Sequence, residues 1–135
     1  MRNEHAVVWI DHHEAHVQSF NRDEAKTSLV KSHAKVRQLH HRSGSITGAK
    51  AHDDIEYFSR IAEALSDAHE ILIVGPAQAK NEFAKYLEHH APALARNLVG
   101  VETMDHPTDG QLLAHARRYF LAVDRMRGDV GSGQA

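Results

Sequence analysis

The chain has 135 residues, a formal net charge of −2 and no cysteine, which suits a single domain with one core and excludes disulfides, thiolate metal sites and redox thiols. Its longest apolar runs are far shorter than the roughly 20 residues that a membrane span requires, and Asp11 interrupts the N-terminal run before a signal-type core develops. We therefore expect a cytoplasmic protein without a membrane partner.

The first part of the chain predicts three strands. Residues 6–11, AVVWID, are rich in β-branched and aromatic side chains, and residues 15–20, AHVQSF, alternate apolar and polar positions. Together they predict a β-hairpin. A third extended segment covers residues 26–39, KTSLVKSHAKVRQL, and a loop follows it up to residue 52.

Helices and two further strands alternate in the rest of the chain. Apolar residues recur at helical spacing from residue 53 to residue 65, and Asp53 or Asp54 suits the N-cap of this helix. The continuous apolar run EILIVG, residues 70–75, is typical of a strand covered on both faces. The remaining predicted elements are a helix within residues 75–92, a strand over 97–104, a helix over 107–126 and a disordered tail over 126–135.

The order β-β-β-α-β-α-β-α predicts one three-layer α/β domain over residues 1–125 with a mixed five-stranded sheet. Three meandering strands followed by βα units with right-handed crossovers are the layout of a ribonuclease H-like fold. We expect its core to contain Val7, Val8, Ile10, Ile61, Leu65, Ile71, Leu72, Ile73, Val74, Phe83, Leu87, Val99, Val101, Leu113 and Phe120.

The segment from Lys31 to His52, which we call the basic arm, carries cations and glycines but no carboxylate. A local excess of positive charge on a glycine-bearing loop is typical of phosphate contact, because glycine lets the backbone approach closely. We therefore predict RNA contact here, with no catalytic residue and no cofactor. The candidate RNA-binding residues are Lys31, His33, Lys35, Arg37, His40, His41, Arg42, Gly44, Gly48, Lys50 and His52.

The chain also resembles a small bacterial family often described as translational machinery proteins, which is distantly similar to the middle domain of archaeal and eukaryotic class-one peptide-chain release factors. The resemblance covers about residues 5–121 and rests on VVWIDHHEAHV, LHHRSGSITGAKAHDDIEYFSRIAEAL, EILIVGPAQAKNEFAKYL and LVGVETMDHPTDGQLLAHARRYF. It implies a ribonuclease H-like, translational-machinery-component-like fold. It also implies ribosomal RNA, transfer RNA or the ribosome as the partner.

In those release factors, a basic strand leads into a loop carrying Gly-Gly-Gln, and the glutamine promotes hydrolysis of peptidyl-tRNA. In this chain Gly44 and Gly48 occupy the corresponding place, but they are not adjacent and no glutamine follows either of them. The resemblance therefore implies the fold and RNA binding without peptide release.

A metal-dependent hydrolase acting on nucleic acid or phosphoesters is the alternative function. In two-metal nucleases of this fold, carboxylates on the first strand, a helix and the fourth strand hold the metals. Asp11 ends the first predicted strand, and Asp53, Asp54 or Glu56 offers a helix carboxylate, but ILIVGP contains no acid. Because the set is incomplete, the favoured interpretation of Asp11 is a turn residue.

The 13 histidines lead to two further expectations. With an ordinary pKa near 6.5, they would add about three positive charges at pH 7 and about ten at pH 6, so RNA contact should strengthen on acidification. A histidine-rich metal site is a third alternative to RNA binding, although HHEAH, residues 12–16, has the wrong spacing for a zinc protease. Its candidate ligands are His12, His40, His41 and His52.

Gly75 and Lys80 form a weak candidate anion site. A helix N-terminus that directly follows a strand offers free N–H groups and a partial positive charge, to which Lys80 would add a mobile ammonium. GPAQAK lacks the full phosphate-loop pattern, so an ordinary strand-to-helix turn is the favoured interpretation.

Overall fold

The computed structural model describes the backbone of residues 5–33 and 43–132 and the side chains of residues 5–33 and 54–126. The strands are β1 (His5–Ile10), β2 (Glu14–Phe20), β3 (Ala25–Lys31), β4 (Glu70–Gly75) and β5 (Leu98–Thr103). The helices are α2 (Ser43–Ala64), α3 (Ala79–His90), the short α4 (Pro92–Ala95) and α5 (Asp109–Ser132). The predicted α/β fold and element order are confirmed, with α4 as an addition.

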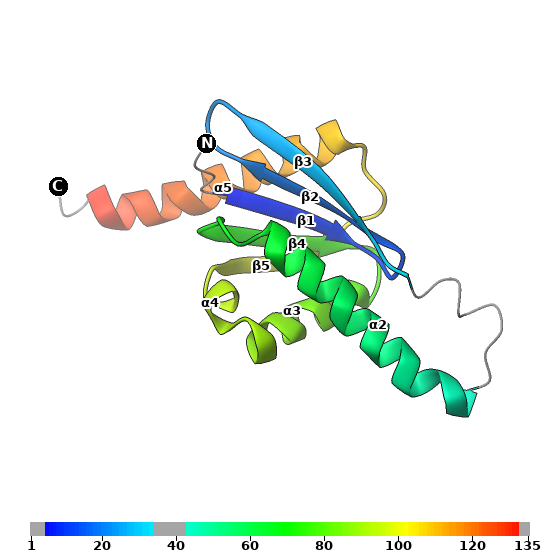
Figure 1. The fold of residues 1–135 in the computed structure, drawn as a ribbon. Coiled ribbons are helices and arrows are strands. Elements are labelled where there is room, and N and C mark those ends of the chain that lie inside the picture. The colour runs from blue at the N-terminus through cyan, green and yellow to red at the C-terminus, as the bar shows by residue number, and fades with distance from the viewer. Residues whose placement is uncertain (1–4, 34–42, 133–135) are drawn as a thin grey trace.

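One five-stranded mixed sheet, in the order β3-β2-β1-β4-β5, forms the middle layer of the domain (Figure 1). β1 pairs antiparallel with β2 and parallel with β4, and β4 pairs parallel with β5. Helices α2 and α3 cover one face of the sheet, and α5 covers the other (Figure 1). The two central strands are therefore covered on both faces, as their continuous apolar runs predict.

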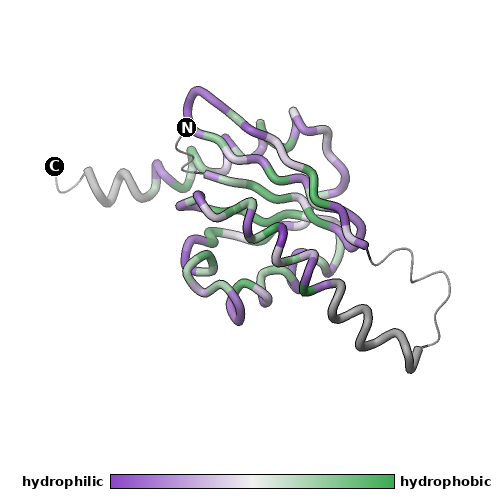
Figure 2. The backbone as a smooth tube through the Cα atoms, viewed as in Figure 1, coloured by the Kyte–Doolittle hydropathy of each residue, from purple (hydrophilic) through white to green (hydrophobic). Residues whose placement is uncertain are grey.

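Apolar residues concentrate along the central strands (Figure 2) and form one cluster on each face of the sheet. The face under α2 and α3 is built around Val8, Ile10, Ile61, Leu65, Ile71, Ile73, Phe83 and Leu87. The face under α5 is built around Val7, Trp9, Leu72, Val74, Leu112, Ala116 and Phe120. Successive residues of β1 and β4 alternate between the two clusters, because successive side chains of a strand point to opposite faces.

Most of the predicted core residues are buried, with three exceptions near β5. Val101 is 37 % exposed, and Val99 and Leu113 are half-buried. β5 is an edge strand that the helices cover only in part, so its apolar residues reach the core less completely than those of β4. The predicted core left out Trp9 and Tyr57, which are almost fully buried.

Helix α2 is longer than predicted. It begins at Ser43, so Asp53 and Asp54 lie inside the helix and the N-cap predicted for them is wrong. The predicted loop therefore ends before Ser43. The sequence pattern favoured a loop because glycine inside a helix costs about 1 kcal/mol relative to alanine, a cost that this helix accommodates. Residues 43–52 of the basic arm therefore belong to the helix, among them the candidate RNA-binding residues Gly44, Gly48, Lys50 and His52.

The other predicted boundaries shift less. Helix α5 continues through Ser132, whereas a disordered tail was expected from Met126 onward. Adding a residue to an existing helix costs much less free energy than starting a new helix. This explains how the glycine-containing segment after Met126 continues α5. Strand β3 ends at Lys31, and the part of the predicted third strand from residue 34 onward lies outside the described residues.

Gly75 ends β4 at a point where the backbone of β1 leaves no space for a side chain. A Cβ atom at this position would collide with the carbonyl oxygen of Ile10. Among the described residues no glycine has a positive φ, so Gly75 is required for the close approach of the two strands rather than for a special turn conformation.

We expect Gly75→Ala to lower the free energy of unfolding by about 2 to 3 kcal/mol, because the added methyl group is forced against backbone atoms. Urea denaturation measures this change. Gly110→Ala is the matched control, since the nearest atom to its added Cβ is Thr108 Oγ1 at 4.0 Å, and it should change stability by less than about 1 kcal/mol. Equal effects of the two substitutions would contradict this explanation of Gly75.

Candidate functional site

The basic arm leaves the sheet at the end of β3 and returns to it through helix α2, whose N-terminal end extends past the sheet edge where β1 ends (Figure 1). The structure describes the side chains of two predicted contact residues, Lys31 and His33, and both are exposed. Lys35, Arg37, His40, His41 and Arg42 lie outside the described residues, and Gly44, Gly48, Lys50 and His52 lie in the part of α2 described by its backbone alone.

The start of the arm is held to the domain by two hydrogen bonds. The guanidinium Nη2 of Arg60 donates to the carbonyl oxygen of Lys31 at 2.6 Å. The backbone N–H of Ser32 donates to the carbonyl oxygen of His13 at 2.8 Å. The arm therefore begins from a fixed position between helix α2 and the β1–β2 hairpin turn. Sequence reasoning missed Arg60, because its spacing from β3 carries no signal.

Tyr57 ties helix α2 to the same hairpin turn. Its side chain is 1 % exposed, and its hydroxyl donates to the carbonyl oxygen of Asp11 at 3.0 Å. Burial, followed by the nearby carboxylates of Asp11 and Glu14, raises the pKa of the Tyr57 phenol well above its ordinary value of 10.0. The phenol therefore stays protonated and keeps donating this hydrogen bond over the whole neutral range.

A carboxylate from α2 lies among the cations at the base of the arm. Glu56 Oε1 is 3.7 Å from Nε2 of His33 and 3.8 Å from Nη2 of Arg60. His33 and Glu56 are largely exposed and Arg60 is partly exposed, so the ion pairs contribute little to stability. They do reduce the local positive charge that the sequence of the arm, read alone, predicts.

Asp11 acts as the turn residue that the favoured interpretation predicted. Its Oδ1 accepts the backbone N–H groups of His13 at 2.7 Å and Glu14 at 2.8 Å, which closes the turn between β1 and β2. Among the described side chains, Asp11, Asp54 and Glu56 do not form a group of three candidate metal ligands. The side chain of Asp53 lies outside this set. The described side chains therefore provide no such group for the hydrolase alternative.

At the edge of the sheet where β1 ends, four histidines each have a ring nitrogen within 3.7 Å of a carboxylate oxygen. The pairs are His12 with Glu82, His16 with Glu14, His33 with Glu56, and His106 with Asp11. Such an edge is acidic when the imidazoles are neutral and becomes more nearly neutral when they gain a proton. Of the predicted histidine metal set, only His12 has a described side chain.

The predicted anion site at Gly75 and Lys80 is not formed as expected. Lys80 is 8 % exposed, and its Nζ donates to the carbonyl oxygen of Ala77 at 2.5 Å. The prediction of a mobile ammonium is therefore wrong, because burial and this hydrogen bond hold the side chain against the turn. Helix α3 begins only at Ala79, so Gly75 does not lie at its N-terminus.

No family model and no curated protein matches this chain. Solved structures do match it. They include Archaeoglobus fulgidus Pelota (19% identity, TM-score 0.63, 96% of this chain and 35% of that chain) and the archaeal translation termination factor aRF1 (12%, 0.59, 97% and 42%). Saccharomyces cerevisiae Dom34, a translation termination-like factor involved in RNA quality control pathways, also matches (9%, 0.51, 82% and 31%).

The chain thus spans between 31% and 42% of the length of these three proteins. At such identities the likeness establishes the fold. The distant similarity to release-factor-like translation proteins that the sequence predicts is confirmed at this level. Separately, no helix in the described part of the chain is both long and apolar enough to cross a membrane.

We expect Asp11→Ala to lower the free energy of unfolding by about 1 to 2 kcal/mol, because two backbone N–H groups lose their acceptor. Asp11→Asn keeps an oxygen at the same place and should cost less than about 1 kcal/mol. Urea denaturation compares the two variants. If purified wild-type protein cleaves RNA in the presence of magnesium and Asp11→Asn does not, Asp11 is more than a turn residue and the hydrolase alternative is favoured.

Proposed function

We propose that the chain is a catalytically silent accessory protein of the translation apparatus that acts in the cytoplasm and binds RNA or the ribosome through the basic arm. The observation that most supports this proposal is the likeness of the fold to Pelota and to the termination factor aRF1, over almost the whole of this chain. The incomplete loop motif supports the silent character, because Ser45 and Ile46 follow Gly44 where a side-chain amide would be needed to act on a peptidyl ester.

The position of the arm also supports RNA contact. Arg60 and Ser32 hold the backbone at its start, while Lys31 and His33 point their side chains to solvent. A cationic segment held at a defined base loses less conformational entropy on binding than a free tail does. Phosphate contacts from such a segment would fix the position of RNA relative to the domain.

Reversing two arm charges should weaken binding to ribosomes or ribosomal RNA. For Lys35→Glu with Arg42→Glu we expect a loss of at least about tenfold near 100 mM salt and a shallower dependence of affinity on salt, because about two phosphate contacts disappear. Cosedimentation with ribosomal subunits over a salt series measures both quantities.

Lys85→Glu with Arg118→Glu is the control for this experiment. Both residues are exposed, they lie on α3 and α5, and their reversal changes the net charge by the same amount. An equal loss in the control would mean that net charge alone governs binding. Absence of the wild-type protein from every ribosomal fraction would refute the proposal itself.

Binding should also depend on pH through the histidines of the arm. At pH 6 imidazoles carry charge and attract phosphate, and at pH 8 they do not, so RNA affinity should be higher at pH 6 at constant ionic strength. Changing His33, His40, His41 and His52 together to glutamine should remove this difference. Fluorescence anisotropy with labelled ribosomal RNA fragments at the two pH values measures it.

A second variant separates the arm from the histidines of the sheet edge. His12→Gln with His106→Gln changes two imidazoles that face Glu82 and Asp11 and lie outside the arm. This variant should keep the full pH dependence. If it loses the dependence while the arm variant keeps it, the edge rather than the arm senses pH.

A further inference from the structure

Three inward-facing rows of side chains on the α5 side of the sheet each end in a potential metal ligand. The rows are residues 5, 7 and 9 of β1, residues 70, 72 and 74 of β4, and residues 112, 116, 120 and 124 of α5. All members are buried and apolar except His5, Glu70 and Asp124. His5 and Glu70 are register partners on parallel strands, so their side chains lie side by side.

The three side chains meet at distances that suit one metal ion. Nε2 of His5 is 2.8 Å from Oε1 of Glu70 and 3.2 Å from Oδ2 of Asp124. The three ligand atoms all lie within 4.8 Å of one another. Zinc bound to nitrogen and oxygen ligands at about 2.1 Å in a tetrahedron places those ligands about 3.4 Å apart. Small movements of the side chains would therefore place one ion in contact with all three.

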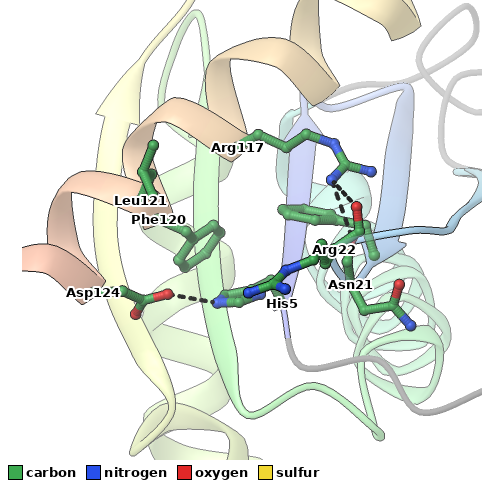
Figure 3. A pocket seen from close by; sticks show the side chains of 8 residues that line it. His5, Asn21, Arg22, Arg117, Phe120, Leu121 and Asp124 are labelled. Carbon is green, nitrogen blue, oxygen red and sulfur yellow. Dashed lines mark hydrogen bonds and ion pairs between the residues drawn. The ribbon is translucent and has the colours of Figure 1, made fainter. Parts of the chain in front are cut away.

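Packing favours an ion at this position. The ring of His5 stacks on Phe20, with centroids 5.6 Å apart, and packs against Phe120 at 4.6 Å, so its orientation is held by two aromatic contacts. Its Nε2 faces the carboxylates, as Figure 3 shows for Asp124.

The guanidinium of Arg117, one described cation near these carboxylates, is held by other partners. Nη1 of Arg117 donates to the carbonyl oxygens of Asn21 at 3.0 Å and Arg22 at 3.2 Å, and its guanidinium lies 5.3 Å from the centre of the Phe20 ring (Figure 3). Arg117 and Arg22 line a pocket of about 360 Å³ together with His5 and Asp124. The pocket has room for several water molecules beside His5 and Asp124.

We propose that His5, Glu70 and Asp124 bind a divalent transition-metal ion, with zinc as the first candidate, and that its remaining coordination positions open into this pocket. One imidazole and two carboxylates suit zinc, cobalt or manganese better than soft ions such as Cu(I). The ion joins the first residues of β1 and β4 to the second half of α5, so binding stabilises the folded chain. The site lies at the amino edge of the sheet, opposite the basic arm, and does not depend on the proposed RNA binding.

The test uses untagged full-length protein that has been treated with a chelator and is titrated with zinc chloride in a calorimeter. We expect one site with a micromolar or lower dissociation constant. Asp124→Asn should weaken this site at least tenfold and reduce the rise in Tm that zinc produces. Glu102→Gln is the matched control. Oε1 of Glu102 lies 2.8 Å from Nε2 of His115, and this histidine–carboxylate pair offers only two potential metal ligands. The control should keep wild-type zinc affinity.

Cobalt absorption identifies the ligands independently. Cobalt bound to the wild-type protein should give visible bands that Asp124→Asn and Glu70→Gln both lose, while circular dichroism checks that each variant is folded. Asp124 is half-exposed, so its substitution should leave the metal-free fold intact. Absence of zinc binding by the wild type would overturn the proposal. Unchanged affinity in both folded variants would also overturn it, because the ion would then be held by surface histidines alone.

Discussion

The parallel pairing of β1 with β4 is the constraint on which the rest of the structure depends. Both strands are buried between two helical layers, and their close approach at Gly75 leaves no room for a side chain. This pair has two ends with different chemistry. Its carboxyl end leads into the hairpin turn closed by Asp11, against which the basic arm begins, and its amino end brings His5 beside Glu70.

Local sequence pattern was sufficient to predict the architecture, because strongly apolar segments have few alternatives. The continuous apolar run EILIVG is buried only if both faces of its strand are covered, which makes β4 a central strand. The alternation of apolar and polar residues in β2 requires a strand that is covered more on one face. Pattern could not predict where helix α2 begins, because the cost of Gly44 and Gly48 competes with contacts made elsewhere in the chain. Nor could it distinguish Val101 at the sheet edge from Val74 at its centre, because strand order is not a local property.

The candidate sites also differ in whether they depend on consecutive residues or on residues far apart in the sequence. The cationic character of the arm is a property of consecutive residues, and it was predictable from the sequence. The partners that modify it come from elsewhere, since Glu56 and Arg60 reach the base of the arm from α2. His5 and Asp124 are still harder to associate, because they are 119 positions apart and meet only when α5 packs across the sheet. Strand register and helix phase together, rather than any motif, bring the three ligands into one place.

Hydrogen–deuterium exchange of the protein with and without ribosomes tests the central claim most directly, since it reports on every backbone N–H at once. If the arm is the contact, exchange should slow in residues 31–52, including the first turns of α2, while α3 and α5 remain unchanged. Slower exchange confined to α3, α4 or α5, with residues 31–52 unaffected, would contradict the account and would place the ribosome contact on a helical face of the domain.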